Sequence, residues 1–385
     1  MSSEVVVLEY QKTGRFFGMI AEDLKSIGVE ELRSLGACEL KMAYRGIFFQ
    51  CDIETLYRIN YQVRFFSRIL APIITFDCHS DRYLYSTARS IDWSLFLTPD
   101  STFAIFSSVH DSNINHSQYA ALKLKDAIAD WFMDRDGRRP DIDTICPDLW
   151  IGLRIFRNRA YIRLDTSGGS MHRRGYREQS VEAPMQETLA AALVEFSGWD
   201  GSTPLYDPFC GSGTILCEAL MKYCRIPSGY LRQRFGFENL PEFDREQWKI
   251  LRKSINSRIR KLPEGLIAGS DISREAVNAA SCNCSLLPSG DRINLKTAPY
   301  INIDELKNMT IISNPPYGLR LRSNENMGGF MKEFGDFLKQ RCSGTRAWVY
   351  FGKRKLIKSM GLKSSIKIPL HNGKLDGRLV LYEMY

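Results

Sequence analysis

The tetrapeptide Asn314-Pro315-Pro316-Tyr317 follows a short apolar run at residues 310–313. An apolar run that ends at prolines is typical of a buried strand that stops abruptly. Asn314 contributes an amide oxygen as a hydrogen-bond acceptor, and nearby backbone carbonyls stay free because proline donates no backbone hydrogen bond. Tyr317 contributes a flat ring on which a planar ligand can stack. Two acceptors beside a ring would hold a planar amine, such as the exocyclic amino group of a nucleobase, although a simple proline turn is the alternative.

A second candidate site is the loop at residues 207–214, Asp-Pro-Phe-Cys-Gly-Ser-Gly-Thr, which follows an apolar run and precedes a helical pattern. Gly211 and Gly213 would let the backbone turn tightly and approach a ligand closely. The loop lacks the third glycine of a dinucleotide-binding fingerprint and the Gly-Lys-Ser/Thr of a P-loop. The carboxylate of Asp207 would repel a pyrophosphate and attract a cation. We therefore expect a sulfonium cofactor that carries an α-amino group.

Asp271 ends the next apolar run, at residues 266–270. A carboxylate at the carboxyl end of a parallel strand can accept hydrogen bonds from both ribose hydroxyls of a nucleoside. The alternative is that Asp271 caps the helix predicted over residues 274–286, and it could do both. Together, the two acids and the glycine loop predict a cofactor site.

The elements that must position these residues fall into two halves. In the first half, strand and helix patterns mix as in an α+β fold, with an expected strand at residues 4–10, helical spacing over 116–132, and strands at 150–156 and 159–165. This half ends at a flexible Thr-Ser-Gly-Gly sequence. Strands and helices then alternate, which predicts a mostly parallel sheet flanked by helices and a terminal antiparallel hairpin.

Composition narrows the class of protein further. The chain has 385 residues, a formal net charge of +8 and a pI of about 8.9, which favours more than one domain and a polyanionic partner without requiring one. The ten cysteines contain no Cys-x-x-Cys pair, so we expect free thiols and no metal site. The sequence has no secretory signal pattern and no run long enough to cross a membrane, so we expect a soluble, cytoplasmic protein.

The loop at residues 207–214 and the sequence Ser-Asn-Pro-Pro-Tyr-Gly at 313–318 together resemble class I, S-adenosylmethionine-dependent amino-methyltransferases. The chain more specifically resembles the THUMP-containing RNA guanine-N2 methyltransferases, which include bacterial 23S rRNA enzymes and related tRNA enzymes. The residues that carry this narrower resemblance are 165–168, 172–177, 183–192 and the Phe-Gly-Phe sequence that begins at residue 235. The resemblance covers nearly the whole chain.

This resemblance implies an α/β fold: a class I (Rossmann-like) methyltransferase domain with a mostly parallel seven-stranded sheet, preceded by an α+β ferredoxin-like and THUMP region. The expected parts are a ferredoxin-like segment at residues 1–67, a THUMP RNA-binding domain at 68–166 and the methyltransferase domain at 167–385. Relatives often carry an acid or an amide near the cofactor's adenine, whereas Thr297 and Ala298 stand at that place here. We therefore assign no side chain to the adenine.

The implied reaction transfers a methyl group from S-adenosylmethionine to the exocyclic N2 of a guanine in RNA, with 23S rRNA as the expected substrate. The side-chain oxygen of Asn314 and the carbonyl of Pro315 would hold the two amine hydrogens, and Tyr317 would stack on the flipped base. The residues expected to bind the cofactor are Asp207, Gly211, Gly213, Asp271 and Asn314.

Five basic residues are the predicted RNA contacts: Arg173, Arg174, Arg177, Lys123 and Lys125. Phosphate contacts by such residues would make the affinity depend on salt. Three alternatives stay open: a tRNA guanine-N2 methyltransferase, a DNA adenine-N6 methyltransferase, and an RNA-binding ribosome-assembly factor with little or no catalysis. The sequence leaves open which nucleotide is methylated, whether the substrate is free RNA or an assembling subunit, and the oligomeric state.

Overall fold

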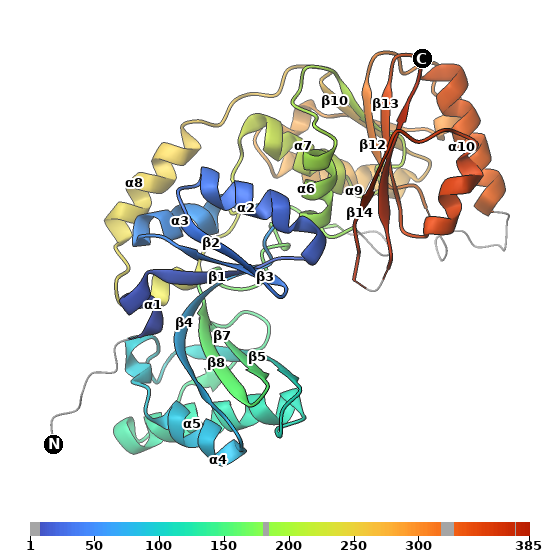
Figure 1. The fold of residues 1–385 in the computed structure, drawn as a ribbon. Coiled ribbons are helices and arrows are strands. Elements are labelled where there is room, and N and C mark those ends of the chain that lie inside the picture. The colour runs from blue at the N-terminus through green and yellow to red at the C-terminus, as the bar shows by residue number, and fades with distance from the viewer. Residues whose placement is uncertain (1–7, 180–184, 317–326, 374) are drawn as a thin grey trace. The chain divides into compact units, whose positions relative to one another are not determined.

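The computed structural model describes residues 8–179, 185–316, 327–373 and 375–385 (Figure 1). Contacts divide the chain into two compact units. The first unit comprises Met1–Met171 and Arg232–Lys253, and the second comprises His172–Leu231 and Ser254–Tyr385. None of the described helices combines the length and the apolar character needed to cross a bilayer.

The first unit is built on an eight-stranded sheet in the order β2-β3-β1-β4-β8-β7-β5-β6. Its strands are β1 (Arg15–Met19), β2 (Cys38–Ala43), β3 (Gly46–Gln50), β4 (Arg68–Asp77), β5 (Thr102–His110), β6 (Asp141–Ile142), β7 (Leu149–Phe156) and β8 (Arg159–Asp165). Its helices are α1 (Glu9–Thr13), α2 (Lys25–Ser34), α3 (Ile53–Gln62), α4 (Asp81–Arg89), α5 (Ser117–Asp136) and most of α8 (Arg245–Asn256). The long strand β4 pairs with β1 near its start and with β8 over the rest, so one strand joins the two parts of this sheet.

The strand expected at residues 4–10 is wrong where the structure describes it. Glu9 and Tyr10 begin helix α1, which ends at Gly14. Gly14 has a φ of 60°, and its N–H bonds the carbonyl of Tyr10, so the glycine allows the short helix to end in a left-handed turn. The first strand that the structure describes is β1, which begins directly afterwards.

Residues 232–253 pack with the first unit through an aromatic cluster, although they lie within the 167–385 stretch of the chain. The ring centroids of Tyr57 and Phe237 are 4.6 Å apart, and those of Tyr61 and Trp248 are 5.2 Å apart. Both tyrosines lie on α3, and the Trp248 side chain lies on α8. Burial of such rings is the main source of stability in a contact of this kind.

The second unit is a seven-stranded sheet in the order β11-β10-β9-β12-β13-β15-β14. Its strands are β9 (Leu205–Asp207), β10 (Ile267–Asp271), β11 (Asn294–Thr297), β12 (Thr310–Ser313), β13 (Arg346–Phe351), β14 (Ile366–Pro369) and β15 (Arg378–Glu383). Its helices include α6 (Glu187–Phe196), α7 (Thr214–Cys224), α9 (Arg274–Ser285) and α10 (Met327–Arg341). Strands β11, β10, β9, β12 and β13 run parallel, and β15 is antiparallel to both of its neighbours. The predicted seven-stranded, mostly parallel sheet and the terminal antiparallel hairpin are confirmed.

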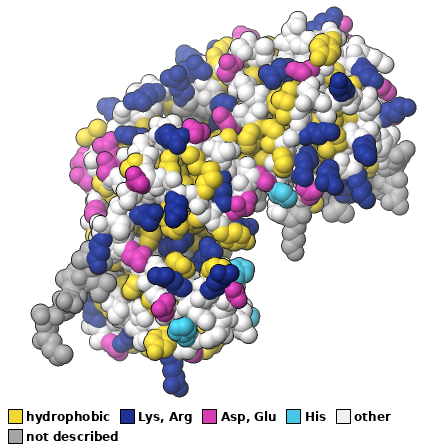
Figure 2. Space-filling model, in the orientation of Figure 1, with side chains coloured by type: hydrophobic (Ala, Val, Ile, Leu, Met, Phe, Trp, Pro, Cys, Tyr) yellow, Lys and Arg dark blue, Asp and Glu magenta, His cyan; other side chains and the backbone are white. Residues whose placement is uncertain are grey.

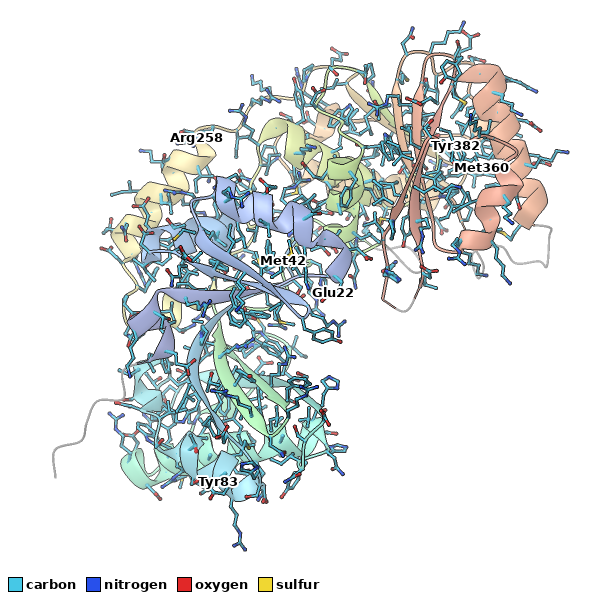
Figure 3. The ribbon with its side chains drawn as sticks, in the orientation of Figure 1. Glu22, Met42, Tyr83, Arg258, Met360 and Tyr382 are labelled. Atoms are coloured by element: carbon cyan, nitrogen blue, oxygen red, sulfur yellow. The ribbon has the colours of Figure 1, made fainter. Side chains whose placement is uncertain are left out.

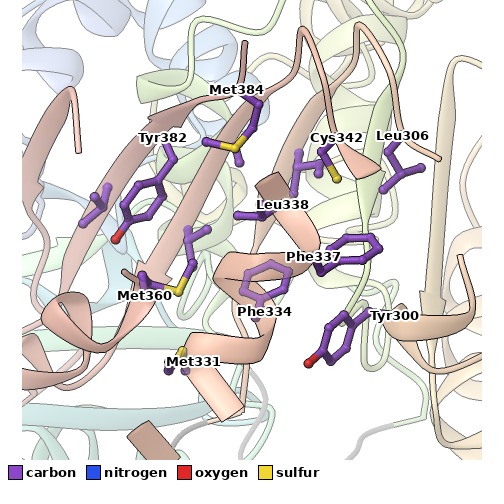
Figure 4. Close-up of a cluster of buried hydrophobic side chains, with 14 of the residues drawn as sticks. Tyr300, Leu306, Met331, Phe334, Phe337, Leu338, Cys342, Met360, Tyr382 and Met384 are labelled. Carbon is purple, nitrogen blue, oxygen red and sulfur yellow. The ribbon is translucent and has the colours of Figure 1, made fainter. Parts of the chain in front are cut away.

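A cluster of buried apolar side chains holds α10 against this sheet (Figure 4). Phe334 and Leu338 of α10 are fully buried in it, together with Ile311 of β12 and Val349 of β13. Burying a large apolar side chain contributes about 1.5–3 kcal/mol. The cluster therefore fixes β12, the strand that leads into the tetrapeptide at residue 314.

Candidate functional site

Three neighbouring strands bring the predicted site residues to one edge of the second unit's sheet. Strands β10, β9 and β12 are adjacent and parallel. Asp271 ends β10, Asp207 ends β9, and Asn314 follows β12. Because the carboxyl ends of parallel strands meet at one edge, these residues lie where ligands bind in open α/β sheets.

Asp207 is buried, with 1% of its surface exposed. Its Oδ1 accepts hydrogen bonds from the hydroxyl of Ser313 at 2.5 Å and from the backbone N–H of Phe209 at 3.0 Å. Among the described residues, nothing donates a hydrogen bond to its Oδ2. Burial raises the pKa of Asp207 to about 7, although the bonds from Ser313 and Phe209 act to lower it. The carboxylate therefore keeps one oxygen for a ligand and would gain from a cationic one.

The glycine loop between β9 and α7 depends on two left-handed residues. Gly211 has a φ of 53° and Gly213 a φ of 81°, which favours glycine at both positions. A Cβ at residue 213 would stand 3.1 Å from the Cβ of Ala280, so the start of α7 approaches α9 closely. The Gly211 N–H donates to Oδ2 of Asp271 at 3.0 Å. The loop is thus tied to the end of β10.

Oδ1 of Asp271 also accepts a hydrogen bond from the Ser273 N–H, at 2.9 Å. The N-cap of α9 is Ser273, whose hydroxyl accepts from Ala276 N, so the alternative that Asp271 caps this helix is wrong. The N–H of Ala298 donates to the backbone carbonyl of Asp271 at 3.0 Å and is not free for an adenine. Ile272, by contrast, is 75% exposed directly beside the acid, an apolar surface that sequence reasoning missed.

The side-chain oxygen of Asn314 is buried and accepts no hydrogen bond from any residue that the structure describes. Pro315 next to it is buried as well. Tyr317, the predicted stacking ring, lies outside the described residues. A buried, unpaired acceptor costs about 1–3 kcal/mol, so such an atom calls for a partner, such as a ligand, a water or an ion.

Asn283 on α9 is a further polar residue of this site that sequence reasoning missed. It is fully buried, and its Nδ2 donates to the carbonyls of Ser212 at 3.0 Å and Gln179 at 2.8 Å. Its Oδ1 accepts from the N–H groups of Glu178 and Gln179, both at 3.1 Å. The side chain therefore clamps residues 178–179 to the glycine loop. The available signal was an amide at helical spacing on the apolar, alanine-rich face of its helix.

The predicted RNA contact Arg174 is buried, with 1% of its surface exposed. Its Nε lies 3.3 Å from Oε1 of Glu218 on α7, and the hydroxyl of Tyr176 donates to the same oxygen at 3.1 Å. Glu218 is fully buried. A guanidinium in this position holds the interior together and offers nothing to a phosphate at the surface, so we remove Arg174 from the proposed RNA contacts.

Arg177 is turned inward too, whereas Arg173 is exposed. An Arg177 amino group donates to Thr214 Oγ1 at 3.0 Å, and the guanidinium pairs with Glu187 at 3.4 Å. Burial raises the pKa of Glu187, and Arg177 opposes that shift. Because Thr214 follows Gly213, Arg177 supports the start of α7. The three arginines thus do not form one surface.

The other two predicted RNA contacts lie on α5 of the first unit. Lys123 lies over the ring of Tyr119, 5.7 Å from its centroid, and Lys125 pairs with Asp126 at 2.7 Å. Both lysines are half-buried. Across the described ranges, no three His, Cys, Asp or Glu side chains gather as metal ligands would.

Three models of known families match this chain. Residues 174–380 match the model described as RMKL-like, methyltransferase domain. Residues 79–165 match the THUMP domain, and residues 16–70 match the RlmL ferredoxin-like domain. The methyltransferase match contains every strand-end residue described above.

Curated relatives and solved structures agree with these matches. A candidate RNA methyltransferase of Synechocystis sp. is 37% identical over 97% of each chain. Ribosomal RNA large subunit methyltransferase K/L of Aliivibrio salmonicida is 34% identical over 94% of this chain and 52% of its own length. The chain thus spans about half the length of the K/L relatives. The structure of SMU.472, a candidate methyltransferase complexed with SAH, has 25% identity and a TM-score of 0.82 over 97% of this chain and 98% of that one.

Proposed function

Because this chain belongs to the RMKL-like methyltransferase family, we propose that it methylates the exocyclic N2 of a guanine in RNA, with 23S rRNA as the substrate. The observation that carries this proposal is the buried side-chain oxygen of Asn314, which has no donor among the described residues. A guanine amine would supply the missing hydrogen. The names of the K/L relatives support ribosomal RNA over other RNAs.

The cofactor is S-adenosylmethionine, which supplies an electrophilic methyl group on a sulfonium. Oδ2 of Asp207, which accepts no hydrogen bond from the described residues, would accept one from the α-amino group of S-adenosylmethionine. Pairing with this cation would offset part of the free-energy cost of burying the Asp207 carboxylate. Asp271 would accept from the ribose hydroxyls, since its carboxylate is half-exposed. The exposed side chain of Ile272 is an apolar surface that the adenine ring would cover.

Asn314 would orient the guanine amine rather than remove its proton. Its amide oxygen and the carbonyl of Pro315 would accept the two amine hydrogens, which turns the nitrogen lone pair toward the methyl group and stabilises the positive charge that develops. The Ser313 hydroxyl donates a hydrogen bond to Asp207, so the residue before Asn314 contacts the first residue of the glycine loop. Tyr317 is proposed to stack on the flipped base.

We keep the three-part division of the chain, with boundaries at 67/68 and 166/167, as part of the proposal. The family matches at 16–70, 79–165 and 174–380 support it. Arg173, Lys123 and Lys125 remain proposed RNA contacts, whereas Arg177 is turned inward and supports the start of α7. RNA held by such phosphate contacts would bind less tightly as the salt concentration rises.

Transfer of isotopically labelled methyl groups tests the proposal. Purified protein and labelled S-adenosylmethionine are mixed with rRNA or with tRNA from cells that lack this protein. We expect label in 23S rRNA. Label in tRNA alone would contradict the rRNA assignment and favour a tRNA enzyme. Label in neither pool would contradict the enzymatic function and leave an RNA-binding assembly factor.

A further inference from the structure

The eight-stranded sheet of the first unit carries α5 on one face, and the opposite face displays a different set of side chains. Along β7, Leu153 is buried, whereas Arg154 and Phe156, which point the other way, are partly exposed. Ser107 of β5 pairs with Leu153, and its hydroxyl donates to the carbonyl of Ser117 in α5 at 2.8 Å. Since paired residues share a face, α5 covers the face of Leu153, and Arg154 points away from it.

Arginine and aromatic side chains alternate on this second face. We call it the arginine–aromatic face and define it by Arg15, Phe17, Tyr44, Phe48, Arg154 and Arg163. The guanidinium carbon of Arg15 lies 5.3 Å from the ring centroid of Phe48, and its buried Nε donates to none of the residues that the structure describes. Arg154 lies 5.6 Å from the centroid of Tyr44. Tyr44 follows β2 and Arg154 lies on β7, so the sheet curves to bring its distant strands together on this face.

Arg163 of β8 is the most enclosed arginine of the face. Its guanidinium carbon lies 4.4 Å from the ring centroid of Phe17 and 5.3 Å from that of Tyr161. Phe17 itself lies across Gly46, where a Cβ would stand only 2.0 Å from the ring. Glycine, ring and guanidinium are thus layered, and Arg163 is 6% exposed. Figure 2 shows Lys and Arg side chains set among hydrophobic ones over the strands of this unit.

No carboxylate of the described part of the chain forms an ion pair with Arg163. Among the described residues its side chain makes neither an ion pair nor a hydrogen bond, and its guanidinium lies near the rings of Phe17, Phe48 and Tyr161. Burial, and next the charge of Arg154, lower the pKa of Arg163 to about 10, so the group stays charged at neutral pH. Glu9 opposes this shift, but its carboxylate accepts a hydrogen bond from Thr75 at 3.0 Å. Cation–π contacts offset only part of the cost of burying a charge.

The same side of the sheet contains a second arginine that lies over an aromatic ring and, unlike Arg163, forms an ion pair. The guanidinium carbon of Arg68 lies 4.3 Å from the ring centroid of Phe106, much as Arg163 lies over Phe17. Arg68 is ion-paired with the fully buried Asp165. Among the described residues, the fold thus supplies an ion-pair partner to one layered arginine and not to the other, so this face keeps an excess of positive charge.

We propose that the arginine–aromatic face binds single-stranded RNA, with Arg15 and Arg154 on phosphates and the rings of Tyr44 and Phe48 against bases. Arg163 lies beneath these rings and adds its positive charge to the face. Phosphate oxygens are acceptors that a guanidinium binds strongly. Base faces stack on aromatic rings whatever the sequence, and only unpaired bases can offer them. An acidic peptide would match the charge but would leave the rings unused. The inference rests on the proposed function in one respect, that the substrate is RNA.

The test compares two double variants of the full chain. Tyr44→Ala with Arg154→Gln alters the face. Tyr83→Ala with Arg33→Gln is the matched control, since Tyr44 is 63% and Tyr83 58% exposed. Tyr83 lies on α4 (Figure 3), and Arg33 lies on α2. Binding of a fluorescent single-stranded RNA and of the matching duplex is followed by anisotropy at several salt concentrations. Arg163→Gln is measured separately, with its melting temperature.

We expect the face variant to bind the single strand about tenfold or more weakly and the control to stay within about twofold of wild type. We also expect a preference for the single strand over the duplex, and a shallower salt dependence for Arg163→Gln with an unchanged or raised melting temperature. Equal affinities for both double variants, no preference for the single strand, or displacement of the RNA by polyglutamate as readily as by unlabelled RNA would overturn the inference.

These outcomes are separable from the proposed function. If the wild type methylates rRNA and the two double variants bind RNA equally, the arginine–aromatic face is refuted and the reaction stands. If the wild type methylates no RNA, and only the face variant binds single-stranded RNA more weakly, the proposed reaction is refuted and RNA binding by the arginine–aromatic face is supported. Calorimetry with S-adenosylmethionine should give wild-type affinity for all variants, because none of the altered residues belongs to the second unit.

Discussion

The hydroxyl of Ser313 donates a hydrogen bond to Oδ1 of Asp207 over 2.5 Å, and this bond joins the end of β12 to the end of β9. Ser313 directly precedes Asn314, and Asp207 begins the glycine loop. Together with the pairing of β12 and β9, this contact fixes the proposed amine holder relative to the proposed cofactor site.

Replacing Asp207 by Asn should change stability in a way that depends on pH. The amide keeps an oxygen for the bonds from Ser313 and Phe209 and removes the buried charge. Burial raises the pKa of Asp207 from 3.8 to about 7. The folded state therefore holds the proton more tightly than the unfolded state, and stability falls as the pH rises through this interval.

We expect Asp207→Asn to be more stable than wild type by on the order of 2–4 kcal/mol above about pH 7.5, and by nothing below about pH 3.5. Urea titrations across this range measure the difference. Asp304→Asn, at an exposed position of the same unit, is the control and should change little. A gain that does not vary with pH would contradict the burial of a titrating carboxyl.

Removing the Ser313 hydroxyl should shift the pH dependence of cofactor binding. The bond from Ser313 is the largest influence that lowers the pKa of Asp207, so Ser313→Ala should raise that pKa further. Affinity for S-adenosylmethionine should rise as Asp207 ionises, and we expect the midpoint of that rise to move up by about one pH unit. Calorimetry between pH 6 and about 9 checks this. Ser281→Ala, exposed on α9, should leave the midpoint in place.

Asn283 should matter far more than its neighbour Asn278 on the same helix. Asn283→Ala removes bonds to Ser212, Gln179 and Glu178 and leaves buried backbone groups unpaired. We expect about 2–4 kcal/mol of lost stability and about tenfold weaker cofactor binding. Asn278 is exposed, so Asn278→Ala should change neither. Thermal melts and calorimetry compare the two, and equal effects would show that the clamp is unimportant.

Arg174 and Arg173 are adjacent and should behave in opposite ways. Arg174→Ala leaves the buried Glu218 without its cation and should cost about 3–5 kcal/mol of stability. Arg173→Ala should leave stability within about 0.5 kcal/mol of wild type and weaken RNA binding at low salt. Urea titration and RNA-binding anisotropy measure both. Equal loss of RNA affinity in two well-folded variants would contradict the structural role of Arg174.

The parts of the site that local sequence determines were predictable. Two glycines between a strand and a helix, acids at strand ends, and prolines after an apolar run each have a local physical cause, so Asp207, Asp271 and Asn314 could be placed at one sheet edge. The alternation of strands and helices likewise predicted the mostly parallel sheet, which the structure confirms.

What could not be predicted depends on contacts between distant parts of the chain. Arg174 looked like a surface cation because nothing near it in sequence reveals Glu218. The clamp by Asn283 and the joining of residues 232–253 to the first unit are likewise tertiary contacts. The strand expected at residues 4–10 was wrong because apolar residues alone do not distinguish a strand from a short helix that ends at Gly14.

The most direct test of the amine-holding role measures N2-methylguanosine formed in 23S rRNA by wild type and by Asn314→Ala at saturating S-adenosylmethionine, with Asn278→Ala as the control. Nucleoside mass spectrometry identifies the product, and calorimetry gives the cofactor affinity. We expect N2-methylguanosine with wild type and the control, and a loss of about 100-fold or more in the rate for Asn314→Ala with cofactor affinity within about threefold. A different methylated nucleoside, or transfer by Asn314→Ala at the wild-type rate, would contradict the role of Asn314.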